Sequence, residues 1–375
     1  MRILHICNDF CGSKVHTNLY RELDGIGVSQ TIFTCYRGAN REGANQFDAA
    51  NTDFVYRGVL TTKHRFFFHY KINTVYKKLV EAVNPKQYDL VHAVTMFTDG
   101  AVAYRLYKEY GIPYVITVRN TDINEFMVVA PHTWPLGLKI LRNARKIIFI
   151  SKAPKEKFCR HFLIKKILSE IEERMLIIPN GVDDFWLEHL DLKSVKDNHQ
   201  IIYVGKFDLN KNVERLLKAV FALKDKYPDI KLHLVGGDGG KQDKIMRMVQ
   251  ENSDCLVYHG KIYDKEKLMS LYRQCSIFAM PSIHETFGLV YIEAMSQNLA
   301  VLYTRNQGID GLFDAKVGEA VNAWSVESIK DGLDKLLSER ANYSIESVDF
   351  ETFRWSKIAA YYISLYEDVK KLFKS

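Results

Sequence analysis

The sequence lacks several features that would place a protein outside the cytoplasm. It has no uncharged apolar run near the roughly 18 residues that a membrane-spanning helix needs. Its start, MRILHICNDF, is apolar only briefly and has no small-residue cleavage site, so we expect no signal peptide. The 6 cysteines have no CxxC spacing and no zinc-like His/Cys partners, which favours reduced, mostly buried thiols. These absences predict a cytoplasmic protein.

Two common nucleotide-binding loops are also missing. The chain has no GxxxxGK[ST] loop, whose backbone would cradle phosphates. Its most glycine-rich turn, LHLVGGDGGK (232–241), does not fit GxGxxG, and no ribose-binding acid follows about 20 residues later. A nicotinamide dinucleotide site is therefore not expected.

The length and charge of the chain predict two domains. With 375 residues the chain is longer than one ordinary core, and 47% hydrophobic and 26% charged residues are typical of a globular protein. Residues 1–180 hold 26 Lys and Arg against 16 Asp and Glu, whereas residues 181–375 hold 26 against 29. This asymmetry indicates two bodies with different partners.

Short β-rich runs alternate with helical patterns along both halves. The alternation predicts parallel sheets covered by helices on both faces, and its restart after residues 190–200 predicts two doubly wound domains. We expect residues 1–185 to form the first domain, 186–352 the second, and 353–375 a C-terminal helix that braces the first. Ligands bind such sheets at the carboxyl ends of the strands. The expected strands are 3–7, 31–36, 88–94, 114–119, 146–151, 175–181, 201–206, 231–237, 255–260, 276–282 and 300–305.

Two lysines surround a loop between an expected strand and helix in the second half. In IYVGKFDLNKNVERLL, Gly205 ends the strand, and Lys206 and Lys211 flank the loop. Glycine lets a ligand approach the backbone, and the two ammonium groups could neutralise a diphosphate at the helix start. The alternative is a pair of solvated surface lysines.

The stretch HETFGLVYIEAM (284–295) places one glutamate in a turn and another in a helix-period run. Glu285 stands in the turn, and Glu293 follows about two helical turns later. Backbone N–H groups of a helix start suit phosphate oxygens and sugar hydroxyls, and an ionised carboxylate accepts strong hydrogen bonds from a diol. The alternative is a capping acid followed by a solvated helix glutamate.

The stretch PSIHETFGLVYIEAMSQNLAVLYT resembles the PSxxExFGxxxxEAMAxGxPV signature of glycosyltransferase family 4. The segments IPNGVD, YVGKFDLNKN, LVGGDGG and HGKIYDKEKLMSLYRQCSIFAMPS precede it in that family's order. The resemblance covers nearly all of the second half and the first half only loosely. It implies the GT-B architecture, with two Rossmann-like domains facing each other across a cleft, and retaining transfer from a nucleotide-diphosphate sugar.

The resemblance also implies a role for each matching residue. Glu285 would hold the donor sugar and act in catalysis, Glu293 would bind the ribose, and Lys206 and Lys211 would neutralise the diphosphate. The other donor contacts would come from Gly205, Gly236, Lys261, Ile262, Thr286, Phe287, Gly288 and Leu289.

Outside this signature, three positions depart from the family pattern. Lys206 stands where the family usually has arginine, and an ammonium lacks the bidentate fork of a guanidinium. The loop after the first strand, NDFCGSKVHTN, supplies only Gly12 where the family often has a glycine pair near the phosphates. Arg119 stands where the family often has a catalytic histidine. It could take over that polar contact, bind the acceptor or pair with Asp122.

No cofactor or metal is expected. The sequence contains no DxD tripeptide, the usual metal-bridging motif of the other large glycosyltransferase fold. Glycosyl transfer requires charge stabilisation on the leaving diphosphate and positioning of the acceptor, and lysines at a helix start can supply the first.

The acceptor is predicted from two basic segments. Residues 57–86 contain seven Lys and Arg against one Glu, interleaved with aromatic residues, and residues 138–166 form a second basic run. Such segments suit an anionic membrane or a lipid-diphosphate-linked glycan. Alternatively, they are solvated helix faces whose aromatic rings point to the core. We expect no nucleic-acid partner, because no recognition motif accompanies the charge.

These observations favour a transferase that moves a hexose or N-acetylhexosamine from a UDP- or GDP-linked sugar to a glycan or lipid-linked acceptor, in polysaccharide or glycoconjugate biosynthesis. We expect it at the inner face of the cell membrane as well as in the cytoplasm. The alternatives are a GT-B epimerase or phosphorylase, and a non-catalytic nucleotide-sugar-binding subunit. The sequence lacks an evident general-base constellation for the epimerase and a pyridoxal lysine motif for the phosphorylase.

Overall fold

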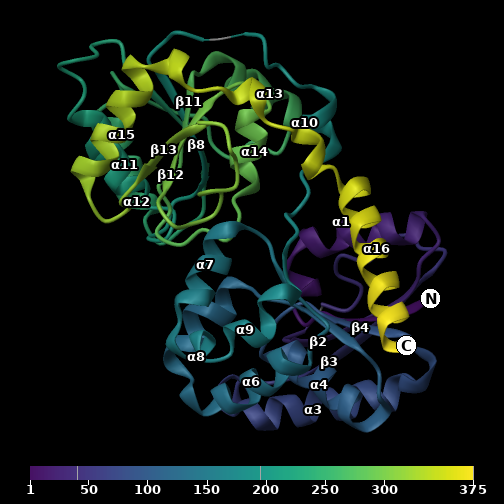
Figure 1. Cartoon of the computed structure of the whole chain (residues 1–375). Helices are drawn as coiled ribbons and strands as arrows, with labels where there is room; N and C mark the ends of the chain where they lie inside the picture. Colours follow the sequence, from purple (N-terminus) through teal and green to yellow (C-terminus); the bar gives the residue numbers. More distant parts are fainter. Residues whose placement is uncertain (40, 195, 375) are drawn as a thin grey trace. The chain divides into compact units, whose positions relative to one another are not determined.

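The chain folds into two compact units (Figure 1). The computed structural model describes residues 1–39, 41–194 and 196–374. Residue 195, in the segment 190–200 between the two expected domains, and residue 375 of the expected C-terminal helix therefore lie outside the described residues. Unit 1 comprises residues 1–150, 154–181 and 355–375, and unit 2 comprises residues 151–153 and 182–354.

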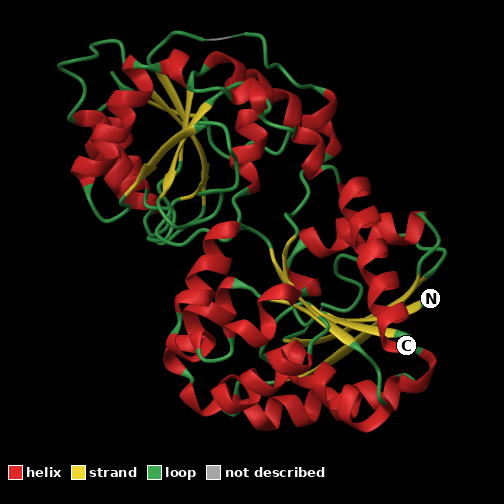
Figure 2. Ribbon diagram, viewed as in Figure 1, coloured by secondary structure: helices red, strands yellow, loops and turns green. Residues whose placement is uncertain are grey.

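Unit 1 is built on a seven-stranded parallel sheet in the order β3-β2-β1-β4-β5-β6-β7. Helices surround this sheet in Figure 2, in which strands are yellow and helices red. The central strand β1 is buried on both faces, as expected of a parallel strand between two helix layers. The strands are β1 Arg2–Ile6, β2 Ser29–Arg37, β3 Thr52–Leu60, β4 Leu90–Ala93, β5 Tyr114–Thr117, β6 Lys146–Phe149 and β7 Met175–Ile177.

Helices cover both faces of the first sheet because successive side chains of a strand point to opposite faces. Leu4 and Ile6 of β1 join a core with α3, α4 and α6, whereas Ile3 joins a core with α1 and α16. The C-terminal helix α16 thus packs beside α1 in unit 1. The helices and helical turns of unit 1 are η1 Phe10–Gly12, α1 Lys14–Gly25, α2 Lys63–Phe66, α3 Phe68–Ala82, η2 Pro85–Gln87, α4 Thr98–Tyr110, η3 Asp122–Phe126, α5 Met127–Val129, η4 Pro131–Thr133, α6 Trp134–Asn143, α7 Lys152–Arg160 (which starts in residues assigned to unit 2), α8 Phe162–Lys165, α9 Leu168–Ile171, η5 Glu172–Arg174 and α16 Trp355–Lys374.

Unit 2 repeats this architecture with a six-stranded parallel sheet in the order β10-β9-β8-β11-β12-β13. The apolar face of the helix after β8 is buried and consists of Leu216, Leu217, Val220 and Leu223. The strands are β8 Gln200–Lys206, β9 Lys231–Gly237, β10 Leu256–Tyr258, β11 Ile277–Ala279, β12 Ala300–Thr304 and β13 Gly318–Val321. The helices are α10 Asp184–Glu188, α11 Val213–Phe221, α12 Gln242–Glu251, α13 Lys265–Gln274, α14 Leu289–Met295 and α15 Val326–Ser338, followed by the turns η6 Arg340–Asn342, η7 Ile345–Ser347 and η8 Phe350–Phe353.

The predicted fold class is confirmed: the chain is α/β, with two doubly wound parallel sheets. All eleven expected strands are present, although several end earlier than predicted, such as β5 at Thr117 and β11 at Ala279. Two strands were not predicted. In β3, Arg57 and Gly58 interrupt a run of β-favouring residues, and β13 is a four-residue GEAV too short to show a pattern.

Candidate functional site

The expected donor residues of unit 2 follow the carboxyl ends of four neighbouring strands. Lys206 ends β8, Gly236 lies near the end of β9, Lys261 follows β10, and Glu285 follows β11. These strands are parallel and adjacent in the order β10-β9-β8-β11, so their carboxyl ends meet at one edge of the sheet. This edge is where doubly wound sheets bind ligands.

Glu285 and Lys211 form an ion pair at this edge. The Lys211 Nζ lies 2.7 Å from Glu285 Oε2, and the two side chains are 26% and 11% exposed. A pair so far removed from water interacts more strongly than a surface pair, whose contribution is about 0–1 kcal/mol. Sequence reasoning assigned the two residues separate tasks, and the structure brings them into direct contact.

Neighbouring loops hold Glu285 from three sides. Its backbone N–H donates to Gln307 Oε1 at 3.3 Å, and its carbonyl accepts the N–H of Gly308 at 3.0 Å. The Asn210 side chain donates to the His284 carbonyl at 2.9 Å and accepts the His284 N–H at 3.0 Å. Sequence reasoning missed Asn210 and Gln307. The carboxylate is therefore positioned by the loops after β8 and β12 as well as by its own.

The turn before α14 presents backbone donors, as its sequence suggests. The Thr286 N–H donates to Glu285 Oε1 at 3.1 Å. Among the described residues, the N–H groups of Phe287, Gly288 and Leu289 donate to no protein acceptor. Gly288 has φ +81°, and a Cβ there would lie 2.5 Å from the Tyr291 ring, so only glycine fits the turn. Phe287 as a whole is 2% exposed, and its side chain packs in the core.

A close approach of β8 and β9 explains the glycine-rich turn. Gly236 has φ +134°, and a Cβ on it would lie 1.9 Å from the Gly205 carbonyl oxygen. Lys206 is exposed to solvent at the end of β8. Lys261 is ion-paired with Asp238, and Ile262 follows it, half-buried, in the loop before α13. These loops leave backbone and ammonium groups at the strand ends.

Glu293 lies in α14, away from the ion pair of Glu285. Burial raises the pKa of Glu293 to about 7, the nearby Asp183 carboxylate adds to the shift, and Lys265 opposes it. Lys265 is itself bound to Asp183, with 2.5 Å between Nζ and Oδ2. Glu293 therefore exchanges its proton near neutral pH, unlike an ordinary surface carboxyl group.

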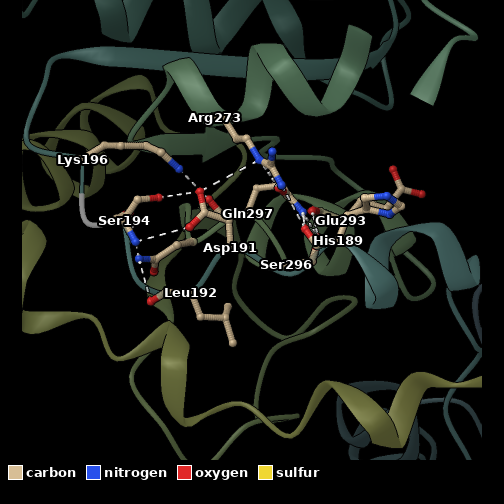
Figure 3. A network of polar contacts seen from close by, with 10 residues as sticks. His189, Asp191, Leu192, Ser194, Lys196, Arg273, Glu293, Ser296 and Gln297 are labelled. Atoms are coloured by element: carbon tan, nitrogen blue, oxygen red, sulfur yellow. Dashed lines mark hydrogen bonds and ion pairs between the residues drawn. The ribbon is translucent and has the colours of Figure 1, made fainter. Parts of the chain in front are cut away.

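A polar network fixes the end of α14 and so the position of Glu293 (Figure 3). The Ser296 hydroxyl donates to the Glu293 carbonyl at 2.6 Å, and Gln297 Nε2 donates to Ser296 Oγ at 3.0 Å. Gln297 also accepts from Arg273 Nε at 2.8 Å and donates to the His189 carbonyl at 3.0 Å. The hydrogen bonds of this network are made by Ser296 and Gln297. These residues directly precede Asn298, which stands where the family signature has a glycine.

In unit 1, Arg119 follows the carboxyl end of β5. Its Nε donates to the Val94 carbonyl at 3.3 Å, and its backbone N–H donates to Asp122 Oδ2 at 2.9 Å. Asp122 also accepts the N–H groups of Met96 and Phe97, at 3.0 Å each. Asp122 thus binds the backbone of Arg119 and forms no ion pair with its guanidinium among the described residues. Gly12 is exposed at the end of η1.

The described residues contain neither a candidate metal cluster nor a candidate membrane-spanning helix. No cluster of three or more His, Cys, Asp or Glu in residues 1–39, 41–194 and 196–374 could hold a metal ion. No helix in the same residues is both long and apolar enough to span a membrane.

Two family models match the chain, one in each half. The model described as Glycosyltransferase Family 4 matches residues 12–184, and the model described as Glycosyl transferases group 1 matches residues 184–347. The border between the two matches falls within a few residues of the border between units 1 and 2.

Curated relatives include glycosyltransferases of more than one kind. The chain is 22% identical over 307 residues to an uncharacterized glycosyltransferase of Methanocaldococcus jannaschii, with 75% of each chain covered. It is 23% identical over 306 residues to the D-inositol 3-phosphate glycosyltransferase of Paenarthrobacter aurescens, with 75% of this chain and 73% of the relative covered.

Solved structures share the fold over nearly the whole chain. The sucrose-phosphate synthase of Thermosynechococcus elongatus is similar with a TM-score of 0.70 and 20% identity, over 98% of this chain and 99% of that one. HepE of Anabaena in complex with UDP is similar with a TM-score of 0.72 and 15% identity, over 98% and 100%. These structures have the GT-B architecture that the sequence predicted.

Proposed function

We propose, on the premise that the chain is a glycosyltransferase of the GT-B fold, that it moves a hexose or N-acetylhexosamine from a UDP- or GDP-linked sugar to a glycan or lipid-linked acceptor. The reaction would serve polysaccharide or glycoconjugate biosynthesis and retain the anomeric configuration. The observation that carries the proposal is the Lys211–Glu285 pair beside the backbone donors of the turn before α14. The similarity to HepE, whose structure was also determined with UDP and glucose, supports a nucleotide-sugar donor.

The proposed mechanism depends on stabilising a leaving diphosphate. Departure of the diphosphate leaves an oxocarbenium-like sugar, and the negative charge on the phosphate oxygens needs nearby positive groups. Lys206 and Lys211 would supply these charges, and the N–H groups of Phe287 and Gly288 would donate hydrogen bonds. Because two ammonium groups can do this work, we propose that the reaction needs no metal, so that a chelator should leave the rate unchanged.

Glu285 would act on the sugar rather than on the phosphate. In the free protein one of its oxygens binds Lys211 and the other accepts the Thr286 N–H. Donor phosphate can compete for Lys211, which would leave that carboxylate oxygen for the sugar hydroxyls. Glu293 would accept hydrogen bonds from the ribose. In a retaining reaction the departing phosphate would take the proton of the acceptor hydroxyl.

Release of nucleotide from a panel of nucleotide sugars tests the proposal. We expect slow hydrolysis of one UDP- or GDP-sugar by the purified protein, faster release when an accepted glycan is added, and loss of both in Glu285→Gln. A non-catalytic subunit would bind the nucleotide sugar but release nothing. An epimerase would convert the sugar without releasing nucleotide. Either result would contradict the proposal.

We also propose that unit 1 binds an anionic membrane surface. Exposed apolar side chains occur in three segments of unit 1: Phe66, Phe67 and Tyr70, then Val128 and Val129, and then Phe162, all more than half exposed. Aromatic contacts link these segments. The Phe68 ring lies 5.7 Å from that of Phe126, and the Trp134 ring lies 5.5 Å from that of Phe162.

Exposed cations accompany these apolar side chains. Lys63 and Arg65 are exposed beside Phe66, and Lys165 and Lys166 are exposed beside Phe162. Apolar groups that enter the boundary of a bilayer, together with lysines near its anionic headgroups, are the two contributions that hold peripheral proteins on membranes. The charge complementarity favours an anionic lipid surface at the inner face of the cell membrane.

Vesicle sedimentation tests this surface. We expect the protein to pellet with vesicles of phosphatidylglycerol and phosphatidylcholine, and Phe66→Ser with Phe67→Ser to reduce the bound fraction about tenfold or more. Tyr361→Ser, which removes an exposed aromatic from α16, is the matched control. Equal binding of all three proteins, or no binding to anionic vesicles, would contradict the proposal.

A further inference from the structure

Unit 1 contains a small pocket at the carboxyl end of β5. Its volume is about 20 Å³, and its lining includes His16, Tyr20, Arg119, Asn180 and Trp355. A single water needs roughly 10–15 Å³ by the same measure, so the pocket admits one small polar group rather than a whole sugar. The pocket is thus of a size to recognise a substituent.

Arg119 brings to the pocket a positive charge without an ion-pair partner among the described residues. Its Nε binds the Val94 carbonyl, whereas its two terminal nitrogens have no hydrogen-bond or ion-pair partner in residues 1–39, 41–194 and 196–374. Asp9 and Asp122 are near enough to feel its charge, but neither forms an ion pair with it among these residues. A guanidinium presents a planar fork of donors that matches a carboxylate or a phosphate.

One buried donor in the pocket lining also lacks a partner. The Trp355 Nε1 has no hydrogen-bond partner within the described part of the chain, and the residue is 5% exposed, whereas the Tyr20 hydroxyl is hydrogen-bonded to the Cys7 thiol. An unpaired buried donor is unfavourable, so such groups are usually satisfied by a ligand or by water. An unpaired indole N–H beside a guanidinium without an ion-pair partner favours an acceptor-rich, negatively charged ligand.

The surrounding structure holds these groups in place. A Cβ on Gly181 would lie 2.4 Å from the Trp355 ring, so the glycine of the IPNG segment allows the indole to pack on the backbone. Both nitrogens of His92 are already bound, one to the Tyr366 hydroxyl at 2.7 Å and one to Thr117 Oγ1 at 3.0 Å. Burial and the charge of Arg119 lower the pKa of His16 well below its ordinary value, which keeps it neutral.

We propose that this pocket binds an anionic substituent of the sugar substrate, with Arg119 as the binding residue and Trp355 as a further donor. The size of the pocket fits the carboxylate of an acidic sugar, and a phosphate monoester shares the same chemistry. The inference rests on the proposed function in one respect, which is that the ligand is a sugar substrate of the transferase. A water molecule could satisfy the Trp355 N–H, but it could not neutralise Arg119.

Binding of simple sugars tests the pocket without knowledge of the full acceptor. Saturation-transfer NMR would compare sodium glucuronate, glucose 6-phosphate and glucose on the full chain. We expect glucuronate to bind and glucose to bind at least about tenfold more weakly. Binding of glucose 6-phosphate in place of glucuronate would support the anion pocket and identify phosphate as its ligand. Binding of neither acid would overturn the proposal.

Variants identify the pocket as the place of binding. Arg119→Gln should weaken glucuronate binding about tenfold or more, Arg119→Lys should weaken it less, and Trp355→Phe should weaken it severalfold while the packing ring is kept. Arg105→Gln, which removes an exposed arginine paired with Glu109, is the matched control. Equal binding by Arg119→Gln and the control, at unchanged melting temperatures, would overturn the assignment.

The same samples separate this inference from the proposed function. The donor residues of unit 2 are assigned to the diphosphate and ribose, and Arg119 is assigned to a substituent of the sugar, so Arg119→Gln should bind UDP or GDP without a sugar as the wild type does. Nucleotide binding without acid binding would overturn the pocket alone. Arg119-dependent acid binding without nucleotide binding would leave the pocket standing and overturn the donor mechanism.

Discussion

The strand ends of unit 2 and the pocket of unit 1 differ in whether their cationic side chains form ion pairs. At the strand ends of unit 2, Lys211 is ion-paired with Glu285, and Lys261 is paired with Asp238. In the pocket of unit 1, the guanidinium of Arg119 has no anionic partner among the described residues. A ligand that binds Lys211 must therefore exchange with an internal ion pair, whereas a ligand that binds Arg119 meets a guanidinium without an ion-pair partner.

This difference predicts which substitutions act on turnover and which act on binding. In unit 2, removal of the carboxylate leaves Lys211 free for the diphosphate, so nucleotide binding survives while chemistry suffers. In unit 1, removal of the cation leaves nothing that recognises an anion, so binding of that group is lost. Each of the following predictions tests one side of the comparison.

The largest effect is expected for Glu285→Gln. The amide keeps the shape of the side chain but cannot stabilise positive charge on the sugar, so we expect turnover to fall by at least about tenfold with nucleotide affinity near normal. Steady-state rates and nucleotide titration measure the two quantities. Glu327→Gln, which removes an exposed carboxylate paired with Lys330, is the matched control and should change neither. A drop in nucleotide affinity as large as the drop in turnover would contradict this division.

A smaller effect is expected for Lys211→Met. Loss of one ammonium at the diphosphate should weaken nucleotide-sugar affinity about tenfold, since a hydrogen bond to a charged group contributes about 1.5–3 kcal/mol. Arg119→Met should leave the affinity for UDP or GDP without a sugar unchanged, because its charge is assigned to a substituent of the sugar and not to the diphosphate. Calorimetric titration of both variants gives the comparison directly. Equal losses in the two variants would mean that both cations serve the same ligand.

The smallest effect is expected from the ionisation of Glu293. Burial raises its pKa to about 7, and the ribose needs the ionised form as a hydrogen-bond acceptor. Donor affinity should therefore rise a few-fold between pH 6 and pH 8 in the wild type and stay flat in Glu293→Gln. Titrations at the two pH values measure this difference. A flat profile in the wild type would show that Glu293 does not bind the donor in its ionised form.

The same raised pKa predicts the pH dependence of stability. Between the ordinary pKa of a glutamate and about 7, the folded protein binds more protons at Glu293 than the unfolded chain does. Stability of the wild type relative to Glu293→Gln is therefore highest at low pH and falls as the pH rises to about 7. Urea unfolding of both proteins at pH 5 and pH 8 measures the change.

The sequence predicted unit 2 in more detail than unit 1 for physical reasons. Glycines, charged turns and buried strands mark the edge of a parallel sheet, so the loops carrying Lys206, Lys211 and Glu285 could be located before the fold was known. The contact between Lys211 and Glu285 could not be predicted, because it joins residues 74 positions apart. The same holds for Asn210 and Gln307, whose roles depend on where neighbouring loops meet.

The lining of the pocket in unit 1 could not be predicted from the sequence either. Arg119 stood out as a departure from a family pattern, but nothing in the chain order indicates that Tyr20 and Trp355 line the same pocket. Those two residues are more than 300 positions apart and are joined only because α16 returns to pack beside α1. The sequence likewise did not determine whether the rings of Phe66 and Phe67 are buried or exposed, because its pattern suits both a core and a surface position.

Thermal unfolding with UDP-, GDP-, ADP- and CMP-sugars, without added metal, tests the central claim most directly. A ligand that binds only the folded state raises the melting temperature by mass action, by an amount that grows with its concentration. We predict a rise with one nucleotide class, UDP or GDP, that is retained in Glu285→Gln and reduced in Lys211→Met. No rise with any of the four would contradict nucleotide-sugar transfer at the strand ends of unit 2.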